Sequence, residues 1–429
     1  MNNDSFRDID IRRSKEHISS FSTFFGVRSF YSSVSFCNRC GSCAQNCPTY
    51  LFSQEEPLSP RGRNQAARLL LEQKLVSEKN IKELLRLVNS CTLCGRCTHY
   101  CAGKTPTPQH VLEIRRLLGK RVLPFTLQKI MEMRFSHPQL FNFLLKTGIF
   151  LRKFGFVKLA RFSGLTTLTG FGWLGKADTL LPGKIPSKKR IAAEKEPTLI
   201  YIPSLETVYF QPSVYQNTLA LVFPLFRTAV WENVPTGRFE YVFGNIRKAR
   251  VQIKQLITRH AQLPTENTPI LTDSIDTYIF LKECSPSLFA GYPKFQKKAE
   301  KFAACVRFIT DFLPSKKDIP EVNTPVYLDK GALFSCEAKP QEDTEKQLRS
   351  YFSENFVQFT YDADMPAFAY SFVMKNNSPQ LLPFVLQPVK EKQIKTIITL
   401  SGWNKMEWER AVKKIDRNIR VLHICELNR

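Results

Sequence analysis

Eight cysteines near the start of the chain form two copies of one spacing, C-x2-C-x2-C-x3-C. They are Cys37, Cys40, Cys43 and Cys47 in the first copy, and Cys91, Cys94, Cys97 and Cys101 in the second. This spacing wraps a tight loop of thiolates around a cubane iron–sulfur cluster, and in two-cluster ferredoxins the fourth cysteine ligates the other cluster. The pattern therefore predicts one [4Fe–4S] cluster on Cys37, Cys40, Cys43 and Cys101, and a second on Cys91, Cys94, Cys97 and Cys47.

Two other uses of dense cysteines compete with this prediction. Structural zinc takes four ligands in one tetrahedron, usually from two separated C-x2-C pairs, and a triple C-x2-C-x2-C followed by a fourth cysteine fits that pattern poorly. A disulfide framework is typical of small secreted domains, whereas cysteines this dense in an intracellular chain are more often metal ligands. Both remain alternatives to the clusters.

The length, composition and net charge of the chain limit the class of protein to which it can belong. With 429 residues, 43% hydrophobic and 23% charged, it is long enough for two or three globular domains. The formal net charge of +24 is typical of proteins that meet nucleic acid, an anionic membrane surface or an acidic protein partner. Four further cysteines, Cys284, Cys305, Cys336 and Cys425, are isolated in the sequence and are expected to be small buried side chains.

The sequence also predicts a compartment. The polar start of the chain, Met1 to Lys15, does not resemble a signal peptide, and no run of 18 or more apolar residues suggests a membrane span. We therefore expect a cytoplasmic protein, either free or peripheral on the inner face of the cytoplasmic membrane.

Helix signals surround the cysteines and must position them. Residues 1–30 have no clear periodicity and are expected to be a tail, and residues 31–120 form the predicted cluster module. Capping pairs predict helices that begin at Ser59-Pro60, after Ser77 and at Thr107-Pro108. The long helical link between the motifs predicts an α-helical two-cluster ferredoxin.

Residues 121–196 are expected to be a basic amphipathic linker. From Lys104 to Lys195 there are 18 Lys/Arg and only 4 Asp/Glu, interleaved with Phe and Leu. This pattern suits a helix lying in a membrane interface. It equally suits a helix that packs on its own protein and exposes a solvated basic face.

Strands alternate with helices in the remainder. Short apolar runs predict strands at Thr198–Ile202, from Ile270, and at Pro325–Asp329, Phe356–Phe359, Thr396–Leu400 and Val421–Ile424. Helices are expected at Asn245–His260, at Glu342–Phe352 and from about Glu407 to Ile415. The predicted fold class is therefore α+β and multidomain, with a pseudo-repeated α/β region whose halves are 197–320 and 321–429.

The chain resembles the iron–sulfur subunits of flavin-linked dehydrogenases. That family includes the iron–sulfur subunits of glycolate oxidase, of anaerobic glycerol-3-phosphate dehydrogenase and of heterodisulfide reductase. The resemblance rests on both cysteine motifs, on Ser59-Pro-Arg-Gly-Arg63 between them and on the helix at Val111–Arg115. It also implies that the C-terminal halves are CCG-like, that is, similar to that family's paired cysteine-rich domains.

The C-terminal half departs from the family pattern. Family members that bind a cluster in this region use adjacent cysteine pairs and a C-x2-C. At the comparable positions this chain has Ser401 and Asn404 in the second half, and Ser274 and Thr277 in the first half. Hydroxyl and amide groups do not replace thiolates on iron. The expectation is that these degenerate domains bind no cluster and act as scaffold.

The resulting hypothesis is an electron-transfer subunit without a catalytic residue of its own. It would relay single electrons through two [4Fe–4S] clusters between a flavoprotein and a quinone or other carrier. Arg61 and Arg63 could raise a cluster potential or could be ordinary solvated arginines. The alternatives are a structural or assembly subunit with static clusters, and a nucleic-acid-binding iron–sulfur protein. The excess of Phe over Trp and Tyr disfavours nucleic acid as a partner.

Overall fold

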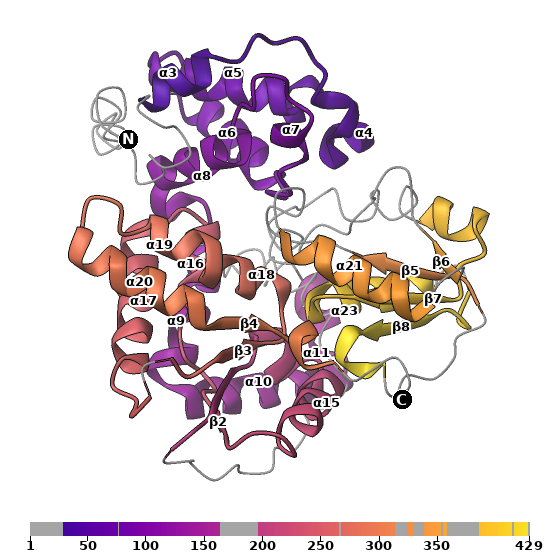
Figure 1. Cartoon of the computed structure of the whole chain (residues 1–429). Helices are drawn as coiled ribbons and strands as arrows, with labels where there is room; N and C mark the ends of the chain where they lie inside the picture. The colour runs from indigo at the N-terminus through magenta and orange to yellow at the C-terminus, as the bar shows by residue number, and fades with distance from the viewer. Residues whose placement is uncertain are drawn as a thin grey trace.

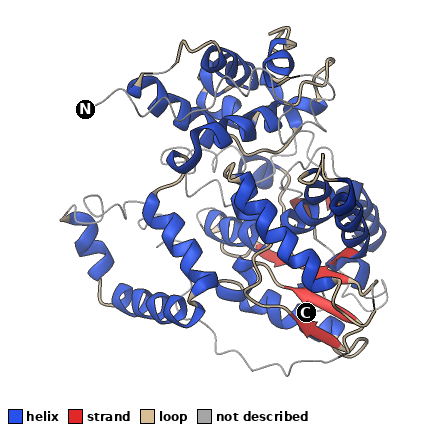
Figure 2. Cartoon of the chain, turned by 90° about the vertical axis from the view of Figure 1, so that its left-hand side faces the viewer, coloured by secondary structure: helices blue, strands red, loops and turns tan. Residues whose placement is uncertain are grey.

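The computed structural model shows a helical module above two sheet-containing halves (Figure 1). The structure describes residues 29–75, 77–163, 196–265, 267–313, 324–329, 339–352, 355–357, 386–413 and 416–427. The predicted tail, most of it before residue 29, the end of the predicted linker at residues 164–195, and Cys336 therefore lie outside the described residues. Figure 2 separates the all-helical module from the region with strands.

The module is built from short helices that alternate with the cysteine loops. They are α3 (Phe30–Ser35), α4 (Pro48–Ser53), α5 (Pro60–Leu71), α6 (Glu78–Asn89), α7 (Arg96–His99) and α8 (Thr107–Leu118). Two of the predicted caps are present: the Ser59 hydroxyl accepts from Gly62 N at 2.9 Å and the Ser77 hydroxyl from Asn80 N at 3.3 Å. Helix α8 begins at Thr107 as predicted but has no side-chain cap. The apolar faces of α5, α6 and α8 then pack into one core.

A buried polar chain fastens three of these helices together. His110 of α8 lies 2.7 Å from the Ser33 hydroxyl of α3 and 2.9 Å from Asn64 Oδ1 of α5. Asn64 in turn donates to Thr107 Oγ1 at 3.0 Å. Because Asn64 Oδ1 can only accept, His110 donates from Nδ1 and accepts the Ser33 proton at Nε2, as a neutral ring.

Acid should therefore weaken the module through His110. Burial lowers the pKa of His110 to about 3, while the unfolded side chain titrates near its ordinary value of 6.5. The unfolded state thus binds the proton first, and stability falls as the pH drops from 6.5 toward 3, by about 1.4 kcal/mol per pH unit. We expect His110→Gln to flatten the pH dependence of the melting temperature between pH 7 and 5.5, measured by circular dichroism. An unchanged slope would contradict this assignment.

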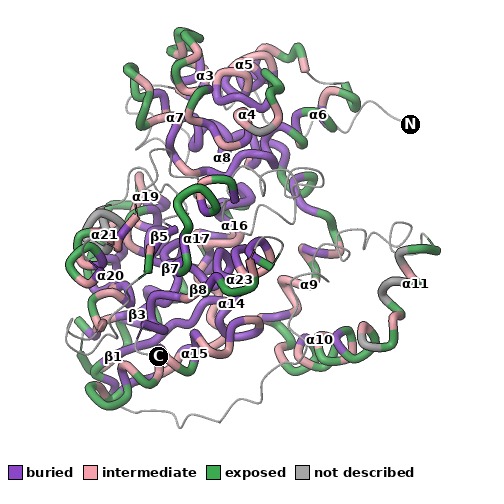
Figure 3. Tube along the Cα trace, turned by 90° about the vertical axis from the view of Figure 1, so that its right-hand side faces the viewer, coloured by how far each residue is buried: buried purple, intermediate pink, exposed green. Residues whose placement is uncertain are grey.

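Helices α9 (Phe125–Ser136), α10 (Pro138–Lys153) and α11 (Phe156–Phe162) fill the described part of the predicted linker. Figure 3 shows α10 and α11 leading away from the sheets with mostly exposed residues. A core contact between Phe141 and Tyr209, with ring centroids 5.3 Å apart, fixes the start of α10 to the body. We call residues 138–163, which contain α10 and α11, the arm.

The first sheet is fully parallel, with the strand order β2-β1-β3-β4. Its strands are β1 (Leu199–Ile202), β2 (Thr228–Val230), β3 (Ile270–Thr272) and β4 (Val306–Phe308). Its helices include α14 (Leu205–Tyr209), α15 (Pro212–Val222), α16 (Arg238–Val242), α17 (Ile246–His260), α18 (Ile275–Ile279), α19 (Ser285–Ser287) and α20 (Pro293–Cys305). The strands predicted at 198–202 and from 270 are confirmed, as is the helix at 245–260, whereas β2 and β4 were not predicted.

The second sheet is also parallel, with the order β6-β5-β7-β8. It contains β5 (Val326–Asp329), β6 (Phe356–Val357), β7 (Thr396–Thr399) and β8 (Arg420–His423), with helices α21 (Lys339–Phe352) and α23 (Gly402–Val412). The predicted strands are present, but the start predicted for the last helix was wrong, because α23 begins directly after β7. The two sheets have the same strand order. An internal repeat in the sequence remains a prediction.

Three of the four isolated cysteines behave as expected. Cys284, Cys305 and Cys425 are buried. Cys284 and Cys425 belong to a continuous core that runs from Phe30 in the module to Leu427 near the end of the chain. The module is thus packed on the α/β region rather than hanging from it.

Candidate functional site

The two cysteine loops have the same backbone conformation. Arg39 and Gly41 have φ values of +57° and +88°, and the corresponding Leu93 and Gly95 have +55° and +82°. Left-handed residues at these two places turn the chain sharply between cysteines, and glycine adopts that conformation without steric cost. The repeated spacing in the sequence therefore corresponds to a repeated loop geometry.

The first loop has a cysteine of the second motif as a close neighbour. The pKa of Cys43 is raised to about 11, first by burial and then by the nearby Cys37, Cys47 and Cys101, because adjacent thiolates repel one another. Cys40 is exposed at the surface of the module. The structure therefore brings Cys101 close to the first motif.

The second loop shows the reciprocal arrangement. The pKa of Cys97 lies well above its ordinary value because of burial, with further contributions from Cys94, Cys91, Cys47 and Cys43. The pKa of Cys94 is likewise raised, first by burial and in smaller part by Cys47. Cys47, the last cysteine of the first motif, is therefore an electrostatic neighbour of the second motif.

The described cysteines form neither disulfides nor a single-ion site. None of the eleven cysteines in the described part of the chain forms a disulfide there. Among the described residues, no three Cys, His, Asp or Glu side chains converge closely enough to hold a single metal ion. Tetrahedral zinc needs four ligand atoms within about 2.3 Å of one ion. The thiols are therefore close neighbours without forming a single-ion site.

A buried arginine lies against the second group of thiols. Arg63 is 2% exposed and donates to Leu87 O at 3.2 Å, Thr49 Oγ1 at 2.9 Å and Ser90 Oγ at 2.7 Å. Its Nη1 lies 3.7 Å from Cys47 Sγ. Its side chain is thus held rigidly in place by neutral acceptors.

The charge of Arg63 provides a test of the cluster prediction. Burial by itself lowers the pKa of Arg63, but the Cys91 and Cys47 thiols outweigh it and the pKa is raised overall. In the part of the chain described by the structure, no carboxylate lies within ion-pair distance of this guanidinium. A nearby anion stabilises a buried cation, and thiolates bound to a cluster would supply that charge. The residues present therefore fit an anionic iron–sulfur group.

Arg61, two residues earlier on α5, is different. It forms a bidentate pair with Glu56, at 2.6 and 2.8 Å, and donates to Arg39 O in the first loop at 3.3 Å. A Cβ added to Gly41 would lie 3.1 Å from its guanidinium. Arg61 therefore braces the surface of the first loop with its charge already neutralised, whereas Arg63 keeps an unneutralised charge inside.

A third arginine, to which the sequence assigned no role, joins the module to the first α/β half. Arg115 of α8 is fully buried and donates to Val88 O at 2.7 Å, to Cys91 O at 3.1 Å and to Val242 O of α16 at 2.7 Å. A Cβ on Gly244 would lie 2.4 Å from the backbone of Arg116, so glycine is required for this close approach. One side chain thus connects a cysteine loop to the α/β region.

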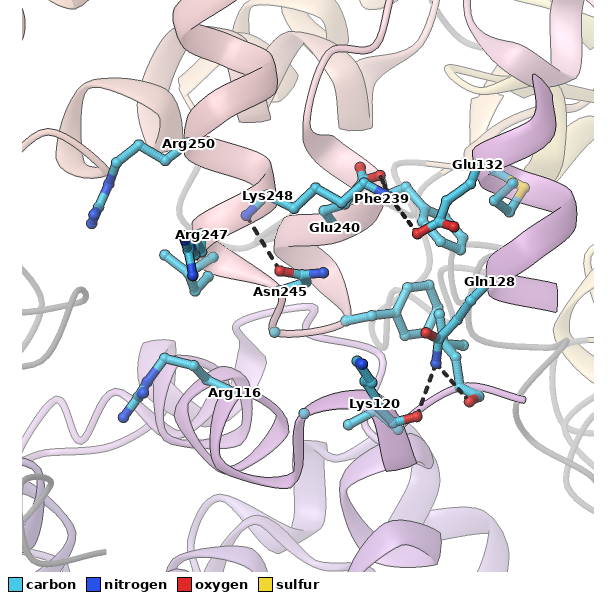
Figure 4. Close-up of a pocket in the computed structure, with 17 residues that line it drawn as sticks. Arg116, Lys120, Gln128, Glu132, Phe239, Glu240, Asn245, Arg247, Lys248 and Arg250 are labelled. Atoms are coloured by element: carbon cyan, nitrogen blue, oxygen red, sulfur yellow. Dashed lines mark hydrogen bonds and ion pairs between the residues drawn. The ribbon is translucent and has the colours of Figure 1, made fainter. Parts of the chain in front are cut away.

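A basic cleft of about 420 Å³ lies beside this junction, between α8, α9 and α17 (Figure 4). Arg116, Arg247 and Arg250 lie on the same side of it in this view. Across the cleft, Lys248 pairs with Glu132 at 2.9 Å and with Glu240 at 3.7 Å. The cleft contributes to the positive charge of the molecule close to the module.

The positions where the sequence departs from the family pattern lie at strand ends. Ser274 and Thr277 follow β3, Ser401 and Asn404 follow β7, and all four are buried. Asn404 donates to Asp329 Oδ2 at 3.0 Å, the same oxygen that accepts from Trp408 at 2.9 Å. The resemblance implies a cluster ligand at position 404. The side-chain amide of Asn404 instead forms a hydrogen bond within the fold.

Comparison with known proteins defines the class of the module. Residues 33–104, which contain all eight cysteines, match the family described as "4Fe-4S dicluster domain". The chain therefore combines a 4Fe-4S dicluster domain with a mixed helix and parallel-sheet region.

One similar protein is the Hdr-like menaquinol oxidoreductase iron-sulfur subunit 2 of Archaeoglobus fulgidus. The similarity is 27% identity over 108 residues, 22% of this chain and 20% of that protein. The chain thus matches about a fifth of the length of this relative. No solved structure matches the chain. Together, the domain and this relative support an iron–sulfur oxidoreductase subunit.

Proposed function

We propose that the protein is an electron-transfer subunit that relays single electrons through two [4Fe–4S] clusters between a flavoprotein and a quinone or another carrier. The observation that carries this proposal is the pair of matching cysteine loops, each with the last cysteine of the other motif as a neighbour. A [4Fe–4S] cluster bound there would accept and release one electron at a time.

The protein side chains would hold, insulate and tune these groups. Cys37, Cys40, Cys43 and Cys101 would bind one cluster, and Cys91, Cys94, Cys97 and Cys47 the other. Arg63 would stabilise the more negative, reduced state, because a buried cation favours added negative charge. Cys40 is exposed at the surface of the module, where a redox partner could approach the first cluster closely.

The proposal is tested on protein purified anaerobically. Iron and sulfide analysis should give about eight of each per chain, and low-temperature EPR should show two interacting reduced clusters after dithionite. Reoxidation by a quinone or a flavoprotein should then remove both signals. Clusters that are present but inert to every electron acceptor would support the static structural role instead, and absent clusters would overturn both.

We further propose that the arm docks on an anionic membrane surface, as a peripheral contact. Residues 138–163 contain five Lys/Arg and no Asp/Glu. Large apolar side chains are exposed along them, including Phe143 at 64%, Phe154 at 64% and Phe162 at 93%. Phe beside cations is the pattern that inserts at the interface of an anionic bilayer. In the described parts of the chain, no helix has the length and apolar character needed to cross a membrane.

Removal of exposed Phe from the arm should weaken membrane binding. In the triple variant Phe143→Ser/Phe150→Ser/Phe154→Ser, we expect partitioning onto vesicles rich in phosphatidylserine to fall about a hundredfold, because each ring contributes roughly 1 kcal/mol when half its surface is buried. Cosedimentation with vesicles measures the change.

Phe125→Ser is the matched control, because Phe125 is 68% exposed but belongs to α9 rather than to the arm. It should bind vesicles like the unaltered protein. Equal binding of the triple variant and the control would contradict the membrane proposal and favour an acidic protein subunit as the partner of the arm.

A further inference from the structure

An apolar cavity of about 290 Å³ lies where α9 and α10 meet the first α/β half. Its lining includes Ile130, Met133 and Leu145 from α9 and α10, together with the aromatic side chains of Phe210 and Trp403. Small-molecule sites typically have about 300–1,000 Å³ and are lined by apolar and aromatic side chains with a few polar groups. This cavity has that composition at the small end of the range.

The cavity opens at the place in the sheet where ligands usually bind. The chain leaves the C-terminal end of β1 at Pro203 and Ser204, which line it, and Thr277, shortly after β3, lines it as well. β2 lies on one side of β1 and β3 on the other, so the crossovers run in opposite directions from this point. Parallel sheets bind ligands outside the carboxyl ends of strands at such switch points.

A buried guanidinium faces the apolar walls. Arg134 of α9 lines the cavity, is 6% exposed, and its Nε has no hydrogen-bond partner among the described residues. Its Cζ lies 4.9 Å from the ring centroid of Phe135 and 5.4 Å from that of Tyr209. A buried N–H without an acceptor is costly, so a ligand oxygen at this position would be stabilised.

A second arginine lines the cavity, and carboxylates offset its charge. Arg238 lies 3.6 Å from Glu206 Oε2 and 3.6 Å from Asp276 Oδ2. Glu206 and Asp276 do not line the cavity themselves, but they offset the charge of Arg238, and the carboxylate residue Glu240 lines the cavity together with the two arginines. This balance favours a neutral ligand with an acceptor oxygen over an anionic one.

We propose that this cavity binds the ring of a quinone-class molecule, with Arg134 donating to a ring carbonyl and the aromatic walls packing on the flat ring. The inference deepens the proposed function and rests on it, because it names the carrier and places it on this chain. The cavity adjoins the junction to the module: Phe243 lines it, and the Arg115 guanidinium lies 5.9 Å from the Phe243 ring.

Calorimetry on the cluster-loaded, oxidised protein tests this binding directly. Menadione should bind at least tenfold more tightly than 2-methylnaphthalene, which has the same ring without carbonyls, and more tightly than myristate. Arg134→Met should remove the preference for menadione over 2-methylnaphthalene, a readout that a purely structural role would not change.

Gly148 offers a way to fill the cavity. It lines the cavity on α10, and a Cβ there would meet no atom within 4 Å. Gly148→Phe should therefore fold and weaken menadione binding at least tenfold, whereas Lys146→Phe, which adds the same ring to an exposed position of α10, should not. Three results would each overturn the proposal: equal affinity for menadione and 2-methylnaphthalene, tighter binding of myristate than of menadione, or unchanged menadione binding by Gly148→Phe. The calorimetric result is separate from the iron count and EPR, so a vacant cavity leaves the electron-transfer proposal standing.

Discussion

Replacement of Arg63 with methionine is expected to destabilise the module by about 3–5 kcal/mol and to lower the potential of the second cluster. Loss of one partner from a buried charge pair typically costs this much, because the other charge stays buried without compensation. Leu87 O, Thr49 Oγ1 and Ser90 Oγ would also lose their common donor. Anaerobic thermal melts followed by cluster absorbance, and EPR-monitored redox titration, measure the two effects.

Arg61→Met is the matched control on the same helix. Its pair with Glu56 is exposed, and exposed pairs contribute about 0–1 kcal/mol. We expect a nearly unchanged melt and potential. If Arg61→Met and Arg63→Met behaved alike, the buried guanidinium would not have the role that its contacts indicate.

Serine replacements of the fourth cysteines should each remove one cluster, and the lost cluster should be that of the other motif. Cys47→Ser should lower the iron content from about eight to about four per chain and leave the EPR spectrum that Cys94→Ser leaves. Cys101→Ser should likewise match Cys40→Ser. Iron analysis and EPR of the four variants provide the comparison.

Cys305→Ser serves as the control, because Cys305 lies in α20 outside both motifs. Its iron content should stay at about eight. The crossed assignment fails if Cys47→Ser gives the spectrum of Cys40→Ser instead, which would mean that each motif holds its own cluster with four consecutive cysteines.

Local signals predicted much of the architecture because local physics determines it. The Ser59 and Ser77 caps fixed two helix starts, and short runs of β-branched residues placed most strands of both sheets. The start of α23 was missed because its first turns are buried on all sides, including Asn404 and Lys405. A helix buried all round lacks the apolar periodicity on which sequence prediction depends.

Within the candidate site, too, local sequence patterns predict some residues and not others. Cysteine spacing predicts candidate ligands from residues near one another in the chain, but it leaves Arg63 undecided between a solvated and an internal role. Arg115 and the cavity at Arg134 depend on contacts between residues far apart in sequence, for example Leu145 and Trp403. Such convergence follows from tertiary packing, which no local pattern encodes.

The guanidinium of Arg115 has a mechanical consequence. The Arg115 guanidinium donates both to the carbonyl of Cys91 and to that of Val242. The module therefore cannot move away from the α/β half without breaking a hydrogen bond to the backbone of a cysteine loop. An electron carrier whose head group moves between partners needs a flexible linker. Under the proposed function, the rigid connection at Arg115 would require redox partners to bind at the cysteine module, and a force that bends this connection would act on the Cys91 loop.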